Sequence, residues 1–190
     1  MLKHLRPSIV LLAIFTILTG IAYPLAMTGI GQVFFKHQAE GSPIERDGVV
    51  VGSSLIGQAF TRSEYFWGRP SAAGKGYDAR SSSGSNLGPS SQALADRIGE
   101  SAKTFGVSAG QIPPDLLTAS GSGLDPHISL AAARFQADRV AQARSMQVAE
   151  VIRLIDEHAV TPSLGFIGEP RVNVLELNLA LDDLGRAPPK

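Results

Sequence analysis

The sequence predicts an α+β protein, with a single N-terminal transmembrane helix followed by one compact exported domain in which several helices gather around a small β element. Three observations lead to this prediction: an apolar run near the N-terminus, a short β-favouring run after it, and helical spacing of apolar residues through most of the remainder. At 190 residues and 44% hydrophobic content, the chain is long enough for one sizeable core but not for two.

The apolar run extends from Pro7 to Phe35, and its only ionisable side chain is the phenol of Tyr23. It exceeds the about 20 apolar residues that a helix needs to cross a bilayer. Pro7 suits the first helical turn, and Tyr23 with Pro24 suits the far interface, where aromatic rings and chain breaks are common. We therefore predict a transmembrane helix over residues 8–30.

A cleavable signal peptide is the alternative, because Lys3, His4 and Arg6 precede the apolar core. The anchor is favoured, since the apolar run is longer than the core of a signal peptide and a small-x-small cleavage site is poorly formed. The positive charges of the leading tail predict a cytoplasmic N-terminus. Residues 1–7 would then be a short cytoplasmic tail, 31–47 a connector and 48–186 an extracytoplasmic domain.

Residues 49–51 and 55–56 are β-favouring runs separated by Gly52, and they predict the β element. A turn-rich region covers residues 62–91. Behind Pro89, apolar residues recur at helical spacing, which predicts a helix that starts at Ser90 or Ser91 and stops at Gly106.

Two further helices are expected after the second Gly/Ser-rich loop. Residues 129–146 are rich in Ala, which predicts a helix with Ser129 as its cap. The next helix ends near His158 and carries on one face Val148, Val151, Ile152 and Ile155. The closing run 172–184 fits both a strand and a helix; a helix capped by Asn173 is favoured, and the strand stays open.

The composition argues against several classes of function. With 17 basic and 17 acidic residues, the chain lacks the excess positive charge that binds nucleic acid. It contains no cysteine, which excludes thiol catalysis and thiolate metal sites. Its four histidines are scattered, so we expect no metal site.

A membrane-anchored periplasmic serine hydrolase is the alternative function, because Ser120, Ser122, Asp125 and His127 lie close together in the sequence. The pattern Gly-x-Ser-x-Gly is absent from these loops, however. We expect instead that Asp125 forms an Asx turn and that His127 bonds to backbone near the helix start. We predict no catalytic residue.

A phosphate-binding loop is a further option, since the segment "GRPSAAGKG" has the composition of one. Its spacing fails, because Gly76 stands where Ser or Thr would hold magnesium. The Gly/Ser-rich stretches 81–91 and 118–129 are long loops, and aromatic residues such as Trp67 and Tyr77 in the first loop region argue against disorder. We interpret these loops as a docking surface.

Four separated segments carry a further signal: "SSLIGQAF", "YFWGRPSAAGKGYDARSSSGSNLGPSS", "TASGSGLDPHIS" and "LGFIGEPRVNVLELNLALD". Together they resemble one known family, the C subunit of the bacterial Kdp potassium-transporting ATPase. The resemblance implies a non-catalytic accessory subunit in the bacterial inner membrane. Its partners would be a channel-like potassium-translocating subunit and a P-type ATP-hydrolysing subunit, and ATP, magnesium and potassium would bind there. The family is also described as raising the ATP affinity of the hydrolysing subunit.

On this resemblance, the two Gly/Ser stretches should pack together and face a partner. The residues expected to contact the partner or to shape the loops are Arg69, Tyr77, Asp78, Asn86, Asp125, His127 and Arg171. The alternative for these residues is internal pairing, of Arg69 with Asp78 or of Arg171 with Asp125.

Overall fold

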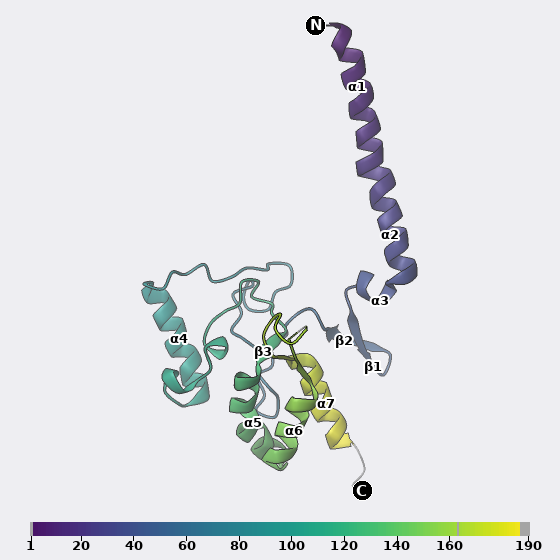
Figure 1. The fold of residues 1–190 in the computed structure, drawn as a ribbon. Coiled ribbons are helices and arrows are strands. Elements are labelled where there is room, and N and C mark those ends of the chain that lie inside the picture. Colours follow the sequence, from purple (N-terminus) through teal and green to yellow (C-terminus); the bar gives the residue numbers. More distant parts are fainter. Residues whose placement is uncertain (1, 163, 187–190) are drawn as a thin grey trace. The chain divides into compact units, whose positions relative to one another are not determined.

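The computed structural model describes residues 2–162 and 164–186, and it divides into two compact units, Met1–Pro43 and Ile44–Lys190 (Figure 1). The first unit contains α1 (Leu2–Ile17), a π-helical turn (Leu18–Ala22), α2 (Tyr23–Phe34) and the short α3 (Lys36–Ala39). Residues Lys3–Phe34 form one helix that is long and apolar enough to cross a membrane. The predicted apolar helix is therefore present, and it extends beyond residues 8–30 at both ends.

Pro24 does not break this helix, contrary to the expectation of a chain break at the far interface. Proline has no N–H to donate and crowds the preceding turn. The π-helical turn lies directly before Pro24, where the N–H of Tyr23 donates to the carbonyl oxygen of Leu18, five residues earlier. Pro24 thereby occupies the first turn of α2, where its missing N–H is tolerated, and the helix continues to Phe34.

The second unit contains two small sheets. In the first sheet β1 (Pro43–Arg46) pairs with β2 (Val49–Ser53). The second has the order β3-β5-β4 and consists of β3 (His127–Ser129), β5 (Arg171–Asn173) and β4 (Ala159–Val160), all antiparallel. The β prediction was right for 49–51 but wrong for 55–56, which form a turn stabilised by the bond from the N–H of Leu55 to the hydroxyl of Ser53, 3.0 Å.

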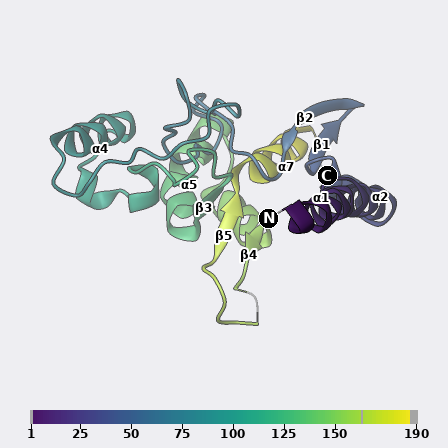
Figure 2. The same cartoon turned by 90° about the horizontal axis from the view of Figure 1, so that it is seen from above.

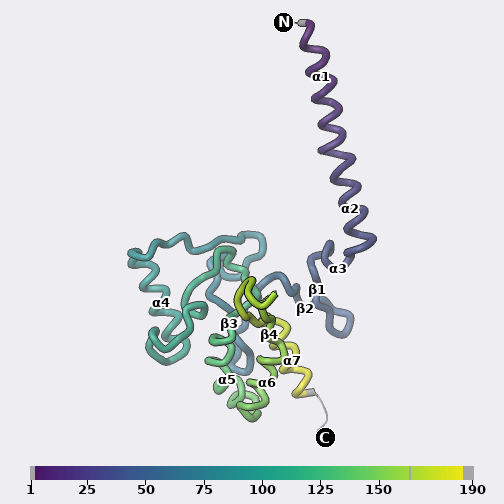
Figure 3. Tube along the Cα trace, in the orientation of Figure 1, coloured from purple at the N-terminus to yellow at the C-terminus, as the bar shows by residue number. Residues whose placement is uncertain are grey.

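The helices of the second unit are α4 (Gln92–Phe105), α5 (Leu130–Arg144), α6 (Val148–Glu157) and α7 (Val174–Arg186), with 3₁₀ turns at Ala109–Gln111 and Pro114–Leu116. Figures 1 and 2 both place α5, α6 and α7 near the three-stranded sheet, with α4 away from α7 at the other end of the unit. The tube in Figure 3 follows the long segment between β2 and α4, which contains neither helix nor strand.

Most of the predicted helix ends are confirmed. Gly106 ends α4 in the left-handed conformation, with a φ of 69°. The Ser129 hydroxyl accepts from the N–H of Ala132 at the start of α5, 3.0 Å. The Asn173 side chain accepts from the N–H groups of Leu175 and Glu176, which starts α7 and shows that the strand alternative is wrong beyond Asn173. Ser91 precedes α4, but its side chain does not cap the helix.

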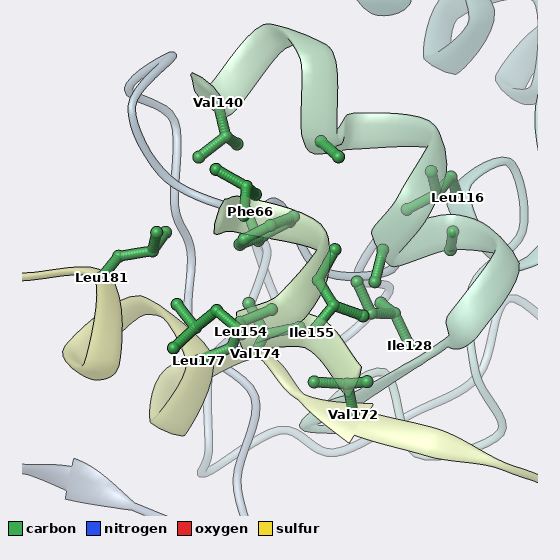
Figure 4. Packing of buried hydrophobic residues seen from close by; sticks show 14 of the residues in the cluster. Phe66, Leu116, Ile128, Val140, Leu154, Ile155, Val172, Val174, Leu177 and Leu181 are labelled. Atoms are coloured by element: carbon green, nitrogen blue, oxygen red, sulfur yellow. The ribbon is translucent and has the colours of Figure 1, made fainter. Parts of the chain in front are cut away.

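The core lies where α5, α6 and α7 meet β3 and β5, and Figure 4 shows its packing. Phe66 reaches this core from the long loop and is fully buried. On α6 the buried residues are Val151, Leu154 and Ile155, whereas Val148 and Ile152 are exposed. The prediction was therefore right for Val151 and Ile155 only. The face of α6 that packs on the core contains Leu154 and leaves out the two exposed residues.

Candidate functional site

The two Gly/Ser stretches pack directly against each other, as predicted. The N–H of Ser83 and the hydroxyl of Ser82 both donate to the carbonyl oxygen of Ser122, at 2.9 and 3.0 Å. We call residues 68–86 and 118–127 the paired loops. Contact is close because Gly123 has no side chain: a Cβ there would lie 2.5 Å from the carbonyl oxygen of Ser83.

Ser71 joins the two sides of the paired loops. Its hydroxyl donates to the carbonyl oxygen of Gly123, 2.6 Å, and accepts from the N–H of Tyr77, 2.8 Å. The Tyr77 hydroxyl in turn donates to the carbonyl oxygen of Arg69, 2.5 Å. Tyr77 has a positive φ of 56°, so these bonds stabilise a backbone conformation that is rare for a residue with a side chain. Burial, together with the negative charge of Asp125, raises the pKa of Tyr77 to about 12.

Arg69, Asp125 and His127 form a charged cluster in the paired loops. Nη1 of Arg69 lies 3.3 Å from Oδ2 of Asp125, and Nδ1 of His127 lies 3.5 Å from Oδ1 of the same carboxylate. The N–H of His127 also donates to Asp125, 3.0 Å, which confirms the Asx turn. Hydrogen bonding from His127, with the charge of Arg69, lowers the pKa of Asp125 despite partial burial of its carboxylate.

The internal ion pairs considered from the sequence were wrong. Arg69 pairs with Asp125 and not with Asp78, whose carboxylate accepts from the N–H of Arg80, 2.9 Å. Among the described contacts, Arg171 forms no ion pair with Asp125; it is exposed on β5 opposite Ser129. The ring of His127 approaches Asp125 and not the backbone at the start of α5, because the Asx turn holds the two side chains together.

The structure therefore brings together four of the seven predicted site residues, namely Arg69, Tyr77, Asp125 and His127. Asp78 follows Tyr77 on the same loop and is exposed. Asn86 is exposed with a φ of 52°, and within the described residues neither Asn86 nor Arg171 is joined to the cluster by a hydrogen bond or ion pair.

The serines of the second loop do not form a catalytic series. The hydroxyls of Ser120 and Ser122 lie 3.4 Å from each other, and the Ser122 hydroxyl accepts from the N–H of Leu124. In the described part of the chain, no hydrogen bond joins either serine to His127. A nucleophilic serine needs a base within hydrogen-bond reach, so this arrangement gives no support to hydrolysis.

Arg69 and Tyr77 also line a pocket of about 280 Å³ between the first loop and α4. The aromatic residues among its walls are Phe60, Trp67, Tyr77 and Phe105. The ring of Phe105 packs against Trp67 with a centroid distance of 5.4 Å, so the last turn of α4 is fixed to the loop. Among the described residues, no group of three His, Asp or Glu side chains is placed to hold a metal ion.

Two residues that position the first loop, Gln136 on α5 and Asn178 on α7, were not predicted from the sequence. Asn178 accepts from the N–H of Phe66, 2.8 Å, and donates to its carbonyl oxygen, 3.0 Å. Gln136 does the same for Trp67, at 2.9 and 3.1 Å. Both amides are 1% exposed. Their signal in the sequence is a polar residue on an otherwise apolar helix face, which indicates a buried amide with backbone partners.

Arg139, one turn after Gln136, completes this arrangement. Its Nη2 donates to the side-chain oxygen of Gln136, 2.6 Å, and its Nη1 donates to the carbonyl oxygens of Ser63 and Tyr65. The guanidinium also lies 3.7 Å from the ring centroid of Trp67, and burial lowers the pKa of Arg139 to about 10. The loop that leads into the charged cluster is therefore fixed from α5 as well as from α7.

Comparisons with known proteins agree with the family resemblance of the four segments described above. Residues 5–183 match the family described as "KdpC: K+-transporting ATPase, c chain". The chain is 56% identical to the potassium-transporting ATPase KdpC subunit of Rhodospirillum rubrum, over 96% of this chain and 97% of that protein. It is also 56% identical to the KdpC subunit of Caulobacter vibrioides, over 100% and 96%, and 53% identical to that of Mycobacterium tuberculosis, over 97% and 100%. The chain therefore belongs to the KdpC family and is an accessory, non-catalytic c chain of a K+-transporting ATPase.

Proposed function

We propose that this chain assembles and stabilises the transport complex by presenting the paired loops as a preformed docking surface. The observation that carries the proposal is the hydrogen-bonded closure of the two loops through Ser71, Ser83 and Ser122. A surface that is ordered before binding loses little conformational entropy when a partner docks. The partners would be a channel-like potassium-translocating subunit and a P-type subunit that hydrolyses ATP.

The seven predicted site residues divide into two groups in this proposal. The first group shapes the loops through internal bonds and consists of Arg69, Tyr77, Asp125 and His127. The second group is exposed, contacts the partner and consists of Asp78, Asn86 and Arg171. Substitution in the first group should lower the stability of the free chain, whereas substitution in the second should weaken only the complex.

Assembly can be tested by co-expressing the chain with the other subunits and purifying the complex in detergent. We expect one stable complex with potassium-stimulated ATPase activity. If the same activity assembles equally well without this chain, the assembly role is wrong.

We further propose that the apolar helix anchors the chain in the inner membrane as a single span, with the N-terminus in the cytoplasm and the second unit outside. Lys3 and Arg6 precede the apolar run, and Lys36 is the basic residue that closely follows it, so the charge bias supports this orientation.

The absence of cysteine makes the orientation directly measurable. We would introduce single cysteines at the exposed positions His4 and Ser90 and treat intact cells with a membrane-impermeant maleimide. Ser90→Cys should be labelled once the outer barrier is opened, whereas His4→Cys should be labelled only after the inner membrane is permeabilised. The reverse pattern would refute the orientation.

An effect on the ATP affinity of the hydrolysing subunit would then be indirect, because ATP and the second unit would lie on opposite sides of the membrane. Such coupling between separate sites travels through the partner's own helices. Removal of this chain should raise the ATP concentration needed for half-maximal activity. Photo-crosslinking with an azido-ATP should label the hydrolysing subunit and leave this chain unlabelled; labelling of this chain would contradict the indirect mechanism.

A further inference from the structure

Arg46 joins the first sheet to α7. We call β1, β2 and the turn between them, residues 43–53, the β1–β2 hairpin. Nη2 of Arg46 forms an ion pair with the exposed carboxylate of Asp183, and Nη1 lies 3.7 Å from Oδ2 of Asp182. A two-stranded sheet is only marginally stable by itself, so the hairpin depends on such contacts with the rest of the second unit.

A second attachment holds the β1–β2 hairpin near the start of α7. The side-chain amide of Asn173 donates to the carbonyl oxygen of Ser54, 2.8 Å, just after β2. Gly52 lies close to α7, because a Cβ there would be 2.8 Å from Cδ2 of Leu175. Figures 1 and 2 both place β1 and β2 beside α7. The hairpin is therefore attached to α7 at two points, and Arg46 provides the one nearer the end of the helix.

Asp182 binds two further side chains besides Arg46. The hydroxyl of Tyr65 donates to Oδ2, 3.1 Å, which is the oxygen that also faces Arg46. Nη2 of Arg144 donates to the other oxygen, Oδ1, 2.8 Å. Tyr65 directly precedes the two loop residues whose backbone is held by buried amides. One carboxylate therefore contacts the β1–β2 hairpin, the end of α5 and the segment that leads into the paired loops.

From this shared carboxylate we propose that Asp182 couples the β1–β2 hairpin to residues 62–67, so that attachment of one segment strengthens attachment of the other. The hydrogen bond from Tyr65 keeps Oδ2 turned toward Arg46, and the charge of Arg46 keeps the same oxygen turned toward Tyr65. Loss of either partner leaves Arg144 as the dominant attraction and allows the carboxylate to rotate toward it. Coupling of this kind is reciprocal, since each contact changes the free energy of the other by the same amount.

The inference rests on the proposed assembly role and deepens it. The chain passes from the first unit into the second within β1, between Pro43 and Ile44. A movement of the membrane helix would therefore reach the β1–β2 hairpin first. Through Asp182 it would then reach Tyr65 and the start of the loop that we propose as a docking surface.

Reciprocity can be tested by amide hydrogen exchange of the full chain in detergent, measured peptide by peptide with mass spectrometry. In Tyr65→Phe, the amides of residues 44–53 should exchange about five-fold faster than in the wild type. In Arg46→Gln, the amides of residues 62–67 should exchange faster by a similar factor. Both variants leave Asp182 paired with Arg144, so neither leaves that carboxylate without a partner.

The double variant Arg46→Gln/Tyr65→Phe separates coupling from two independent effects. Its residues 44–53 should exchange no faster than those of Arg46→Gln, because the coupling is already lost in the single variant. Arg134→Gln is the matched control: it removes an arginine from another ion pair, with Asp156 at 2.8 Å, and should leave both segments at the wild-type rates. Exchange in α6 is the internal reference for the stability of the whole unit and should stay unchanged in Arg46→Gln and Tyr65→Phe.

If Arg46→Gln also speeds exchange in α6, Arg46→Lys provides the second test, because lysine keeps the charge but lacks the two-pronged guanidinium that contacts both carboxylates. It should still speed exchange in residues 62–67. A response on one side only, or additive effects in the double variant, would overturn the coupling and show that Asp183 holds Arg46 independently of Tyr65. The measurement uses the chain without its partners, so that result would leave the assembly role intact, whereas failure to recover any partner would refute the assembly role and leave the coupling.

Discussion

At the scale of single residues, the two buried amides Gln136 and Asn178 act as partners for a loop that has no neighbouring strand. Phe66 and Trp67 would otherwise bury backbone groups without hydrogen bonds, which is costly inside a protein. Each amide supplies one donor and one acceptor, so it satisfies the N–H and the carbonyl oxygen of one residue. The core thereby fixes the start of the loop that carries Arg69.

Gln136→Leu should lower the free energy of unfolding by about 2 to 4 kcal/mol, because it leaves the N–H and carbonyl groups of Trp67 without partners. Trp67 is the only tryptophan, so its fluorescence reports both the unfolding transition and the local change. Gln142→Leu is the control, on an exposed position of the same helix. An equal loss of stability in both variants would contradict the role of Gln136.

Asp125 makes the stability of the chain depend on pH under acidic conditions. Its folded pKa is below the usual value, so its contribution is fully present above about pH 4 and is lost as the pH falls through the lower folded pKa. Asp125→Asn should lose about 1 kcal/mol or more at neutral pH and should lose less further stability on acidification than the wild type. Denaturant unfolding followed by Trp67 fluorescence between pH 3 and 7 measures both effects.

If the free energy of unfolding falls equally between pH 7 and pH 3 in Asp125→Asn and in the wild type, another carboxylate is responsible for the loss of stability in acid. Asp96→Asn is a suitable control, since this carboxylate lies on the surface of α4 and, among the described residues, accepts a side-chain hydrogen bond only from the exposed Gln92. The free energy of unfolding of this variant should change with pH as that of the wild type does.

At the scale of the elements, the paired loops depend on glycine at one contact point. Gly123 has a φ of 66°, and a Cβ at this position would lie 2.5 Å from the carbonyl oxygen of Ser83 and 2.7 Å from the nitrogen of Ala73. Both atoms belong to backbone, so neither can move without displacing the first loop. The contact therefore requires glycine for its conformation and for its lack of a side chain.

Gly123→Ala should separate the two loops and lower the thermal midpoint of unfolding by several degrees, consistent with a loss of about 2 kcal/mol. Gly121→Ala is the matched control, because a Cβ at Gly121 meets no atom within 4 Å. Only the variant at Gly123 should weaken recovery of partner subunits if the paired loops are the docking surface. Equal behaviour of the two variants would show that close packing of these loops is unimportant.

The helices were more predictable than the strands of the second sheet. Gly106, Ser129 and Asn173 mark helix ends by local chemistry, and the structure uses all three. Strands β3, β4 and β5 contain only two or three residues each, too few for a period to be recognised. Their pairing joins residues as far apart in the sequence as His127 and Asn173, so it is decided by the packing of α5, α6 and α7.

At the scale of the whole molecule, the chain consists of an apolar helical unit and a second unit with its own core. None of the described residues in the long helix from Lys3 to Phe34 is buried, whereas the core residues all come from the second unit. A unit that contains its own core is expected to fold independently.

A chain that begins at Lys36 should therefore fold without the anchor and show the same Trp67 unfolding transition as the full chain in detergent. It should be recovered without detergent and should not sediment with membranes. Aggregation of this chain, or a much lower unfolding temperature, would show that the second unit depends on the helix.

The sequence by itself determined the apolar helix, the order and ends of the main helices and the family, which follow from local patterns: apolar runs, helical periodicity, caps and short motifs. The proximity of the two Gly/Ser loops was predicted only through the resemblance to that family. Only the tertiary structure decided that Arg69 pairs with Asp125, that Gln136 and Asn178 hold the first loop, and that Phe166 between β4 and β5 is exposed. Each of these contacts joins segments far apart in the sequence or depends on which side of an element faces the core, so it is settled when the whole domain packs.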